Sequence, residues 1–486
     1  MALTAKREKM LALLVVPAVG AAVLAAGLSI AISAGALGGD PVTGEALREP
    51  PVLRAKDGKL SVTLNAKQSI TTLGGRSIQT PAVYNGSIPG PTLIVRPGDH
   101  LQILSKNGLT QPTNLHTHGL HVSPKGHGDN VFINTPPGAT FTNEYEIPKD
   151  HIPGVYWYHP HRHMYVNDQV VGGMAGAIIV EGAAESLPEI KDARRRVMIF
   201  EQFQVGSDGV LVPFGEKNPA PVNTYINGQL QPVIDIRPGE IQIWRLLNLN
   251  GDAFLRLQIP VGLEAWLAAS DGTPLNRVRG VRSMLLAPAA RRTILVRAKA
   301  TGDIALNSID WGAGLQFAKG AQMATVRVAG ARRADQQLPG KVFDMPDLRG
   351  EPVAAKRTVQ FSIEPQPAPD PPQFLINGMN YDSWGKTNLA KMKLNTVEEW
   401  TLTNTSSEYH PFHIHIQPFQ VISINGVPEK GLTYRDTVAI PPAVDGVPGQ
   451  VVIRQRYTDF TGRFVIHCHI LFHEDHGMMA PVEVVK

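Results

Sequence analysis

The sequence predicts an all-β protein built from three tandem β-sandwich units, preceded by an apolar N-terminal segment. From about residue 50 onward, short runs of Val, Ile, Thr and Leu alternate with Pro-Gly and Asn-Gly pairs, and no long stretch has helical periodicity. The chain has 486 residues, which suits about three domains of roughly 150 residues each. A repeat at this same spacing is the third observation that favours the fold class.

Each copy of the repeat contains an Asn-Gly pair, a strand, a tight turn and a further strand. The pairs are Asn85-Gly86, Asn227-Gly228 and Asn377-Gly378, which lie 142 and then 150 residues apart. Pro-Gly turns follow the first two pairs, whereas the third copy has lost its Pro-Gly. Because chance recurrence of turn pairs explains this spacing less well, we expect three sandwich domains at residues 50–182, 190–332 and 350–486.

The first 37 residues have the composition of a secretory signal or a membrane anchor. Lys6, Arg7 and Lys9 precede an uncharged, mostly apolar run over residues 11–37, which exceeds the roughly 20 residues that cross a bilayer. Ala34-Gly35-Ala36 also fits a cleavage site, so we expect either a cleaved signal or an uncleaved anchor that attaches the chain to a membrane. Both place the body of the protein outside the cytoplasm, because the basic flank stays inside.

Charge and cysteine content narrow the choice of partners. The net charge is only +4, with 46 basic and 42 acidic residues, so we expect no nucleic-acid partner. The single cysteine, Cys468, excludes an intramolecular disulfide. A lone cysteine in an exported protein is free, intermolecular or bound to metal, and its neighbours His467 and His469 favour metal.

Ten of the 16 histidines fall into four groups, each with a His-X-His pair. The pairs are His116-Thr-His118, His159-Pro-His161, His413-Ile-His415 and His467-Cys-His469. Alternate residues of a strand share one face, so four pairs can present eight imidazoles to a single cavity. No packing need selects imidazole repeatedly at this spacing. At two to three imidazoles per ion, the pattern predicts about three metal ions between the first and third units.

A second ligand set remains when those eight histidines are set aside: His410, Cys468, His473 and Met478. Strand alternation points Cys468 away from the two histidines that flank it. Imidazole, thiolate and a weak thioether are the ligands of a blue electron-transfer copper, although zinc would also accept two His and a Cys. This terminal stretch therefore predicts two neighbouring metal centres joined by a short covalent path.

These segments resemble the multicopper oxidases over nearly the whole chain after the N-terminal segment. The matching motifs are His-X-His-Gly at 116–119, Trp-Tyr-His-Pro-His at 157–161, His-Pro-Phe-His-Ile-His at 410–415 and the terminal His-Cys-His, with His and Met five and ten residues after the cysteine. The ending looks most like bacterial copper-efflux and spore-coat oxidases. The resemblance implies three cupredoxin-like Greek-key domains and an enzyme that couples one-electron oxidation of a small reductant to four-electron reduction of dioxygen to water.

The resemblance also implies the ligands of about four copper ions. It assigns His116 and His413 to a type 2 copper, His118, His159 and His469 to one type 3 copper, and His161, His415 and His467 to the other. The type 1 copper would take His410, Cys468, His473 and axial Met478. Cys468 passes the electrons, and Asp129 and Glu474 align with carboxylates that relay protons, although a turn residue and a solvated loop carboxylate are the plain alternatives.

The identity of the reductant depends on loops around the type 1 copper. The chain has only 12 methionines and lacks the methionine-rich inserts of copper-efflux oxidases, so we expect a laccase-like oxidase of phenols or aromatic amines. A metallo-oxidase for Cu(I), Mn(II) or Fe(II) is the alternative, and Asp436 resembles an acidic residue near type 1 that helps to bind metal or phenol.

Two other classes fit the sequence less well. A copper nitrite reductase has no use for eight paired imidazoles, and a non-catalytic scaffold protein of this fold would have lost ligands, whereas none is missing. We expect the middle unit to act as a spacer between the other two.

Overall fold

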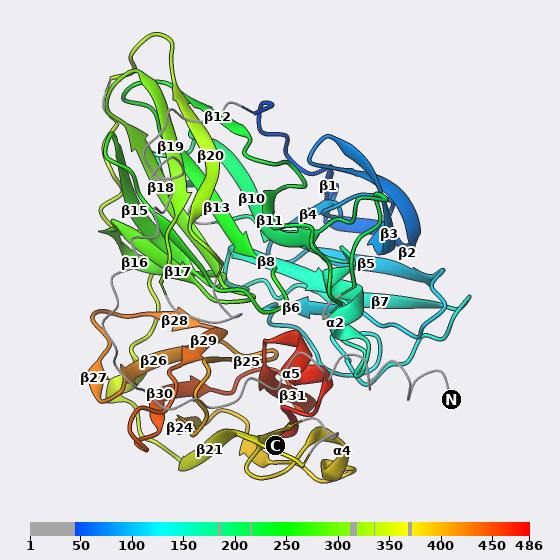
Figure 1. The fold of residues 1–486 in the computed structure, drawn as a ribbon. Helices are drawn as coiled ribbons and strands as arrows, with labels where there is room; N and C mark the ends of the chain where they lie inside the picture. Colours follow the sequence, from blue (N-terminus) through cyan, green and yellow to red (C-terminus); the bar gives the residue numbers. More distant parts are fainter. Residues whose placement is uncertain (1–43, 183–185, 214–215, 312–317, 335, 368–371) are drawn as a thin grey trace, which may run out of the picture.

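The chain is described by a computed structural model over residues 44–182, 186–213, 216–311, 318–334, 336–367 and 372–486. The expected signal or anchor at residues 1–37 lies outside these ranges. The described residues form six β-sheets, which group into three pairs along the chain (Figure 1). The predicted all-β class with three sandwich units is therefore confirmed. Within the described ranges, no helix has the length and apolar character required to cross a bilayer.

The first pair of sheets has the strand orders β1-β4-β9-β8-β6 and β3-β2-β5-β7. Its strands are β1 (Val52–Arg54), β2 (Lys59–Leu73), β3 (Arg76–Tyr84), β4 (Thr92–Val95), β5 (His100–Asn107), β6 (His116–His118), β7 (Thr140–Glu146), β8 (Gly154–His159) and β9 (Gly176–Val180). A buried apolar core that includes Leu64, Leu93, Ile103 and Ile178 lies between the two sheets. This core fixes the strands that carry the first two histidine pairs.

The second pair has the orders β11-β10-β13-β18-β15-β16 and β12-β20-β19-β14-β17. Its strands are β10 (Arg194–Gln204), β11 (Val222–Ile226), β12 (Val233–Ile236), β13 (Ile241–Asn248), β14 (Leu255–Gln258), β15 (Leu263–Ser270), β16 (Thr273–Gly280), β17 (Ser283–Leu286), β18 (Arg291–Ala298), β19 (Gly302–Ser308) and β20 (Ala321–Val328). Trp244, Leu257 and Val326 belong to the core between them.

The third pair has the orders β22-β21-β24-β30-β26-β27, with β28 added to β26, and β23-β32-β31-β25-β29. Its strands are β21 (Ala355–Glu364), β22 (Gln373–Ile376), β23 (Ala390–Lys393), β24 (Val397–Asn404), β25 (His410–Ile414), β26 (Phe419–Ile424), β27 (Val427–Pro428), β28 (Tyr434–Arg435), β29 (Thr437–Ile440), β30 (Gly449–Arg456), β31 (Gly462–Cys468) and β32 (Met479–Val485). Cys468 itself lies in the core of this unit, together with Trp400 and Phe412.

The three units repeat the same local structure at the Asn-Gly pairs. Each pair follows the last residue of β3, β11 or β22, and both residues of every pair have positive φ, from 49° to 77°. That geometry suits Asn and Gly and matches the two-residue hairpin turn with positive φ at both positions. The strand pairs β2–β5, β10–β13 and β21–β24 are parallel in all three units. The repeat therefore reflects one shared topology.

Short helices interrupt the strands at α2 (Val166–Val171), α4 (Tyr381–Trp384), α5 (Leu471–Asp475) and the 3-10 turn η1 (Leu348–Gly350). Helices α2 and α5 join the first unit to the third, since Val166 and Val170 pack on Leu471. Figure 1 shows α5, in red, at the boundary between the first and third units, close to α2. The first and second units share a buried apolar interface that includes Trp157 and Leu247.

Candidate metal centres

Two strands of the first unit carry one half of the histidine cluster. Strand β6 holds His116 and His118, and it pairs with β8 so that His116 lies opposite His159. Strand β8 ends there because Pro160 has no N–H to offer the sheet. Beyond the strand, the backbone N–H of His161 donates to Asn114 Oδ1 at 2.6 Å, which fixes the fourth imidazole. All four of these histidines are buried.

Two strands of the third unit carry the other half. In the antiparallel pair β25–β31, His413 lies opposite His467, and Phe412 lies opposite Cys468. His415 and His469 follow just beyond the ends of the two strands. Each of these four imidazoles is also fully buried.

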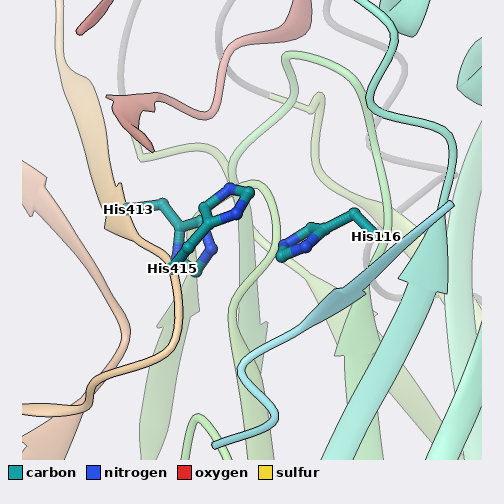
Figure 2. A group of neighbouring side chains, drawn as sticks. All are labelled: His116, His413 and His415. Atoms are coloured by element: carbon teal, nitrogen blue, oxygen red, sulfur yellow. The ribbon is translucent and has the colours of Figure 1, made fainter. Parts of the chain in front are cut away.

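The eight imidazoles meet in one buried cluster between the first and third units. The ring of His116 stacks on that of His415 with 3.8 Å between centroids, and His118 stacks on His413 at 3.7 Å. Figure 2 shows His116 facing His413 and His415 from the opposite strand. His161 Nε2 lies 3.1 Å from His467 Nε2. Side chains that are up to about 350 residues apart in the sequence therefore share one site.

Three triads within the cluster have their possible ligand atoms within 4.8 Å of one another: His116, His413 and His415; His116, His118 and His159; and His161, His415 and His467. The third triad coincides with one ligand set that the family resemblance implies. The remaining histidine, His469, has its ring centroid 5.1 Å from that of His118 and 5.5 Å from that of His159.

The free nitrogens of the cluster fit bound metal ions. Among the described residues, no hydrogen-bond partner exists for Nε2 of His116, His159 and His413, for Nδ1 of His118 and His415, or for either nitrogen of His469. A buried polar atom without a partner is costly, and a metal ion would satisfy each of these atoms. Burial also lowers the pKa of His116, His118 and His413 well below the ordinary value, which keeps the neutral imidazole that ligates metals.

The structure brings the cysteine set together at a second position. Cys468 Sγ lies 3.5 Å from His410 Nδ1 and 3.7 Å from His473 Nδ1, and all three residues are buried. Met478 is fully buried, and its carbonyl accepts a hydrogen bond of 3.0 Å from the Cys468 N–H. Burial raises the pKa of the Cys468 thiol well above its ordinary value, so a thiolate here needs a bound cation to compensate its charge. Thiolate and imidazole donors are the ones that copper prefers.

His473 is the residue of this second group that reaches the surface. Its side chain is 8% exposed, whereas His410, Cys468 and Met478 are fully buried. Its Nε2 lies 3.5 Å from Glu408 Oε2, and its ring stacks on Phe374 at 4.4 Å. His410 is held from the inside, since its Nε2 bonds to Ser406 Oγ at 2.7 Å. Of the four side chains in this group, His473 is therefore the one that a molecule in solution can contact.

Helix α5 connects the two centres. His473 and Glu474 are consecutive in this helix, and they point to different sites: His473 toward Cys468, and Glu474 toward the cluster, 2.9 Å from His467 Nδ1 and 3.4 Å from His161 Nε2. Burial raises the pKa of Glu474, but the nearby His161 and His467 outweigh burial and lower it to about 2. The solvated loop carboxylate considered for Glu474 is wrong, because its side chain is fully buried.

Asp129 is the second carboxylate that contacts an imidazole of the cluster. Both carboxylate oxygens lie 2.9 Å from His116 Nδ1, and the Thr117 N–H donates to Oδ1 at 2.8 Å. Asp129 Oδ2 also lies 3.7 Å from His415 Nδ1. Carboxylates that accept the second N–H of a ligand histidine fix its orientation.

Asp436 differs from the expectation that it lies beside the cysteine centre. It is buried against the eight-imidazole cluster, with Oδ1 3.2 Å from His118 Nε2. Its carboxylate pairs with Arg291, the first residue of β18 in the second unit. The sequence reasoning missed Arg291, and the only available signal was the charged pair Arg291-Arg292 beside the apolar run at 294–296. The middle unit is thus more than a spacer, since it contributes a side chain next to the cluster.

Together, the fold and these two centres define a copper-binding redox protein, and comparison with known proteins identifies the family. Family profiles described as multicopper oxidase match residues 65–185 and 353–486, which together exceed half of the chain. The chain therefore belongs to the multicopper oxidase family, and it is an oxidoreductase that uses dioxygen as the acceptor. The predicted family and class of enzyme are confirmed.

Individual relatives cover most of the chain at modest identity. The multicopper oxidase mco of Staphylococcus aureus is 26% identical over 449 residues, which span 90% of this chain and 92% of the relative. The laccase of Bacillus subtilis is 25% identical over 463 residues, spanning 82% and 89%. A structure described as the multicopper oxidase from Campylobacter jejuni, a metallo-oxidase, superposes with a TM-score of 0.78 at 26% identity and covers 92% of this chain and 96% of that one. The cupredoxin-like nature of the three units is confirmed by these structural relatives.

Proposed function

We propose that the chain is a laccase-like oxidase that holds four copper ions: one at the cysteine centre and three in the histidine cluster. His410, Cys468, His473 and Met478 hold the first ion. His116 and His413 hold a second, and His118, His159 and His469 a third. His161, His415 and His467 hold the fourth. Bound copper supplies one-electron redox chemistry, so that electrons taken singly from a reductant are combined to reduce dioxygen to two waters.

The observation that carries this proposal is the position of Cys468 between the two centres. Its Sγ faces His410 and His473, while the residues bonded to it on either side, His467 and His469, belong to the cluster. Each flanking residue is one peptide bond away, so the chain itself provides a covalent electron path. Strand β25, with His410 at the cysteine centre and His413 in the cluster, also spans the two centres, but there the two histidines are three residues apart.

The chain's other residues have separate tasks in the reaction. The exposed edge of His473 receives electrons from the reductant. Asp129 and Glu474 contact different imidazoles of the cluster, at 2.9 Å from His116 Nδ1 and 2.9 Å from His467 Nδ1. Reduction of dioxygen to water consumes four protons, and carboxylates at these positions can take up and pass on protons.

Phenols and aromatic amines are the proposed reductants. A laccase and a bilirubin oxidase are among the relatives. Oxidation of Cu(I), Mn(II) or Fe(II) is the second candidate, since the carboxylate of Glu408 lies 3.5 Å from His473 Nε2 and attracts cations to the edge that receives electrons. The structural relative described as a metallo-oxidase is also consistent with this reading.

We further propose that the three pairs of sheets are domains at residues 50–182, 190–332 and 350–486, with the three-copper cluster between the first and the third. The body of the protein lies outside the cytoplasm, on the basis of the basic and apolar character of residues 1–37. That segment is either a cleaved signal or an anchor that attaches the enzyme to a membrane.

The copper assignment is tested with Cys468→Ser and, as control, His127→Gln, which changes an exposed histidine outside both centres. The wild-type protein and the control are expected to hold about four coppers per chain, to be blue and to consume dioxygen with a phenolic dye. Cys468→Ser is expected to lose the blue band and one copper while the far-UV circular dichroism stays unchanged. A blue Cys468→Ser protein would refute the assignment of the cysteine centre.

The reductant is identified by oxygen uptake with a panel of phenols, aromatic amines, Cu(I), Mn(II) and Fe(II). A higher kcat/KM for the aromatic compounds supports the laccase-like proposal. A higher value for a metal ion replaces it with the metallo-oxidase.

A further inference from the structure

One buried side chain of the second unit contacts all three units at the edge of the histidine cluster. Arg291, at the start of β18, is 1% exposed. Its Nε donates to the carbonyl of Val155 in the first unit at 3.1 Å, and its Nη1 donates to the carbonyl of Ala289 in its own unit at 3.1 Å. Nη1 and Nη2 donate to the two carboxylate oxygens of Asp436 in the third unit at 2.7 and 2.5 Å. The guanidinium thus has partners on every side.

The carboxylate that Arg291 holds is in turn attached to two cluster imidazoles. Asp436 Oδ1 accepts from His118 Nε2 at 3.2 Å, and the backbone carbonyl of Asp436 accepts from His413 Nδ1 at 2.8 Å. The Thr437 hydroxyl donates to the same Oδ1 at 3.0 Å. With these nitrogens engaged, the free nitrogens of the two rings, His118 Nδ1 and His413 Nε2, are those left for the metal.

The backbone of Gly119 packs closely against the pair of Arg291 and Asp436. Gly119 follows His118 with a φ of +85°, and a Cβ there would stand 2.3 Å from Asp436 Oδ2 and 2.7 Å from Arg291 Nη2. Both carboxylate oxygens of Asp436 accept from the guanidinium, and a bidentate contact of this kind fixes the orientation of the carboxylate.

We propose that Arg291 is a positioning residue of the metal cluster: it fixes Asp436 so that His118 and His413 present the correct nitrogens to copper. This inference rests on the proposed function, because it assumes that the histidines bind copper. The inference gives the second unit, which carries Arg291, a role in positioning the histidine cluster. An interaction of this kind, one residue removed from the ligands, alters metal affinity by about 10- to 100-fold.

The next residue in the strand offers a matched control. Arg292 is also buried, and it pairs with Asp271, with Nη1 2.7 Å from Oδ1. Among the described residues, its guanidinium donates to Asp271 and to the backbone carbonyl of Arg291, and not to Asp436 or a cluster histidine. The same change, Arg→Lys, at the two positions therefore separates an effect on the cluster from the general cost of altering a buried ion pair.

The experiment compares wild type, Arg291→Lys and Arg292→Lys after loading with copper. Copper loss to a competing chelator is followed by the electron paramagnetic resonance signal of the histidine-bound copper, and the blue band serves as an internal measure of the cysteine centre. Lysine keeps the charge at 291 but cannot make the bidentate contact. We expect Arg291→Lys to shift the resonance parameters and to weaken retention of the histidine-bound copper by about 10- to 100-fold, with the blue band kept. Arg292→Lys is expected to match wild type.

Unchanged resonance and copper retention in folded Arg291→Lys would overturn the inference while leaving the proposed function intact. A wild-type protein that loads no copper at the histidines would instead refute the proposed function. If Arg291→Lys does not fold, the double variant Arg291→Met/Asp436→Asn removes both buried charges together. The same weakened retention is expected in it, and wild-type retention in it would overturn the inference.

Discussion

The contribution of one buried carboxyl in the second unit to the stability of the protein should fall as the pH rises from about 5 to about 8. Glu201, on β10 opposite Tyr225, is 3% exposed, and its Oε2 has no hydrogen-bond partner among the described residues. Burial raises the pKa of Glu201 from 4.5 to about 8. In the unfolded chain the carboxyl ionises near its ordinary value, so between the two pKa values the unfolded state binds fewer protons than the folded state.

The sign and size of the effect follow from this difference. Where the folded state binds more protons, the free energy of unfolding decreases as the pH rises, by at most about 1.4 kcal/mol per pH unit for one group. Integrated from about pH 5 to about pH 8, the loss due to Glu201 is about 3 to 4 kcal/mol. Glu201→Gln keeps the volume and removes the ionisation, so it should remove this part of the pH dependence.

The assay is urea unfolding followed by circular dichroism at several pH values across that range, with wild type, Glu201→Gln and Glu264→Gln. Glu264 is a suitable control because a hydrogen bond from Arg297 lowers its pKa, so its contribution changes only below pH 4.5. The difference in unfolding free energy between Glu201→Gln and wild type should grow with pH, whereas that for Glu264→Gln should stay constant. A constant difference for Glu201→Gln would show that its carboxyl ionises normally in the folded protein.

Two further predictions concern the sites. Gly119→Ala should reduce the free energy of unfolding by about 3 kcal/mol or more, since it combines backbone strain at φ +85° with a Cβ 2.3 Å from Asp436 Oδ2. Thermal or urea unfolding measures this loss. The control Gly138→Ala, with φ +76° and no atom within 4 Å of its Cβ, should lose only about 1 kcal/mol. Glu408→Gln should lower kcat/KM for cationic reductants by up to about fivefold, because an exposed ion pair contributes at most about 1 kcal/mol. The kcat/KM for neutral phenols in the same oxygen-uptake assay should not change. An equal fall for both kinds of reductant would contradict the proposal that Glu408 attracts cations.

Much of the fold could be predicted because its signals are local. The Asn-Gly turns require positive φ at two successive residues, and only a few residue types adopt that conformation readily. The His-X-His spacing likewise depends only on the alternation of side chains along a strand, and β6 places His116 and His118 as that rule predicts. Such features can be recognised in one sequence without knowledge of distant contacts.

The features that were missed depend on contacts between distant segments. The pairing of Arg291 with Asp436 joins residues 145 positions apart, and neither residue has a local pattern that reveals its partner. Helix α5 has only five residues, too few for a helical period to appear in the sequence. Because of that helix, His473 and Glu474 serve different centres although they are neighbours in the chain.

The location of the ligands along the chain also sets the order in which the sites can form during synthesis. His467, Cys468, His469 and His473 all lie within the last 20 residues of the 486. A growing chain that lacks β31 still carries six histidines of the cluster, from β6 to His415, but neither centre is complete. Copper can therefore be bound at its final coordination only after β31 and α5 have been synthesised and have joined the third sheet pair. Copper bound at its final coordination thus indicates that the third sheet pair has folded.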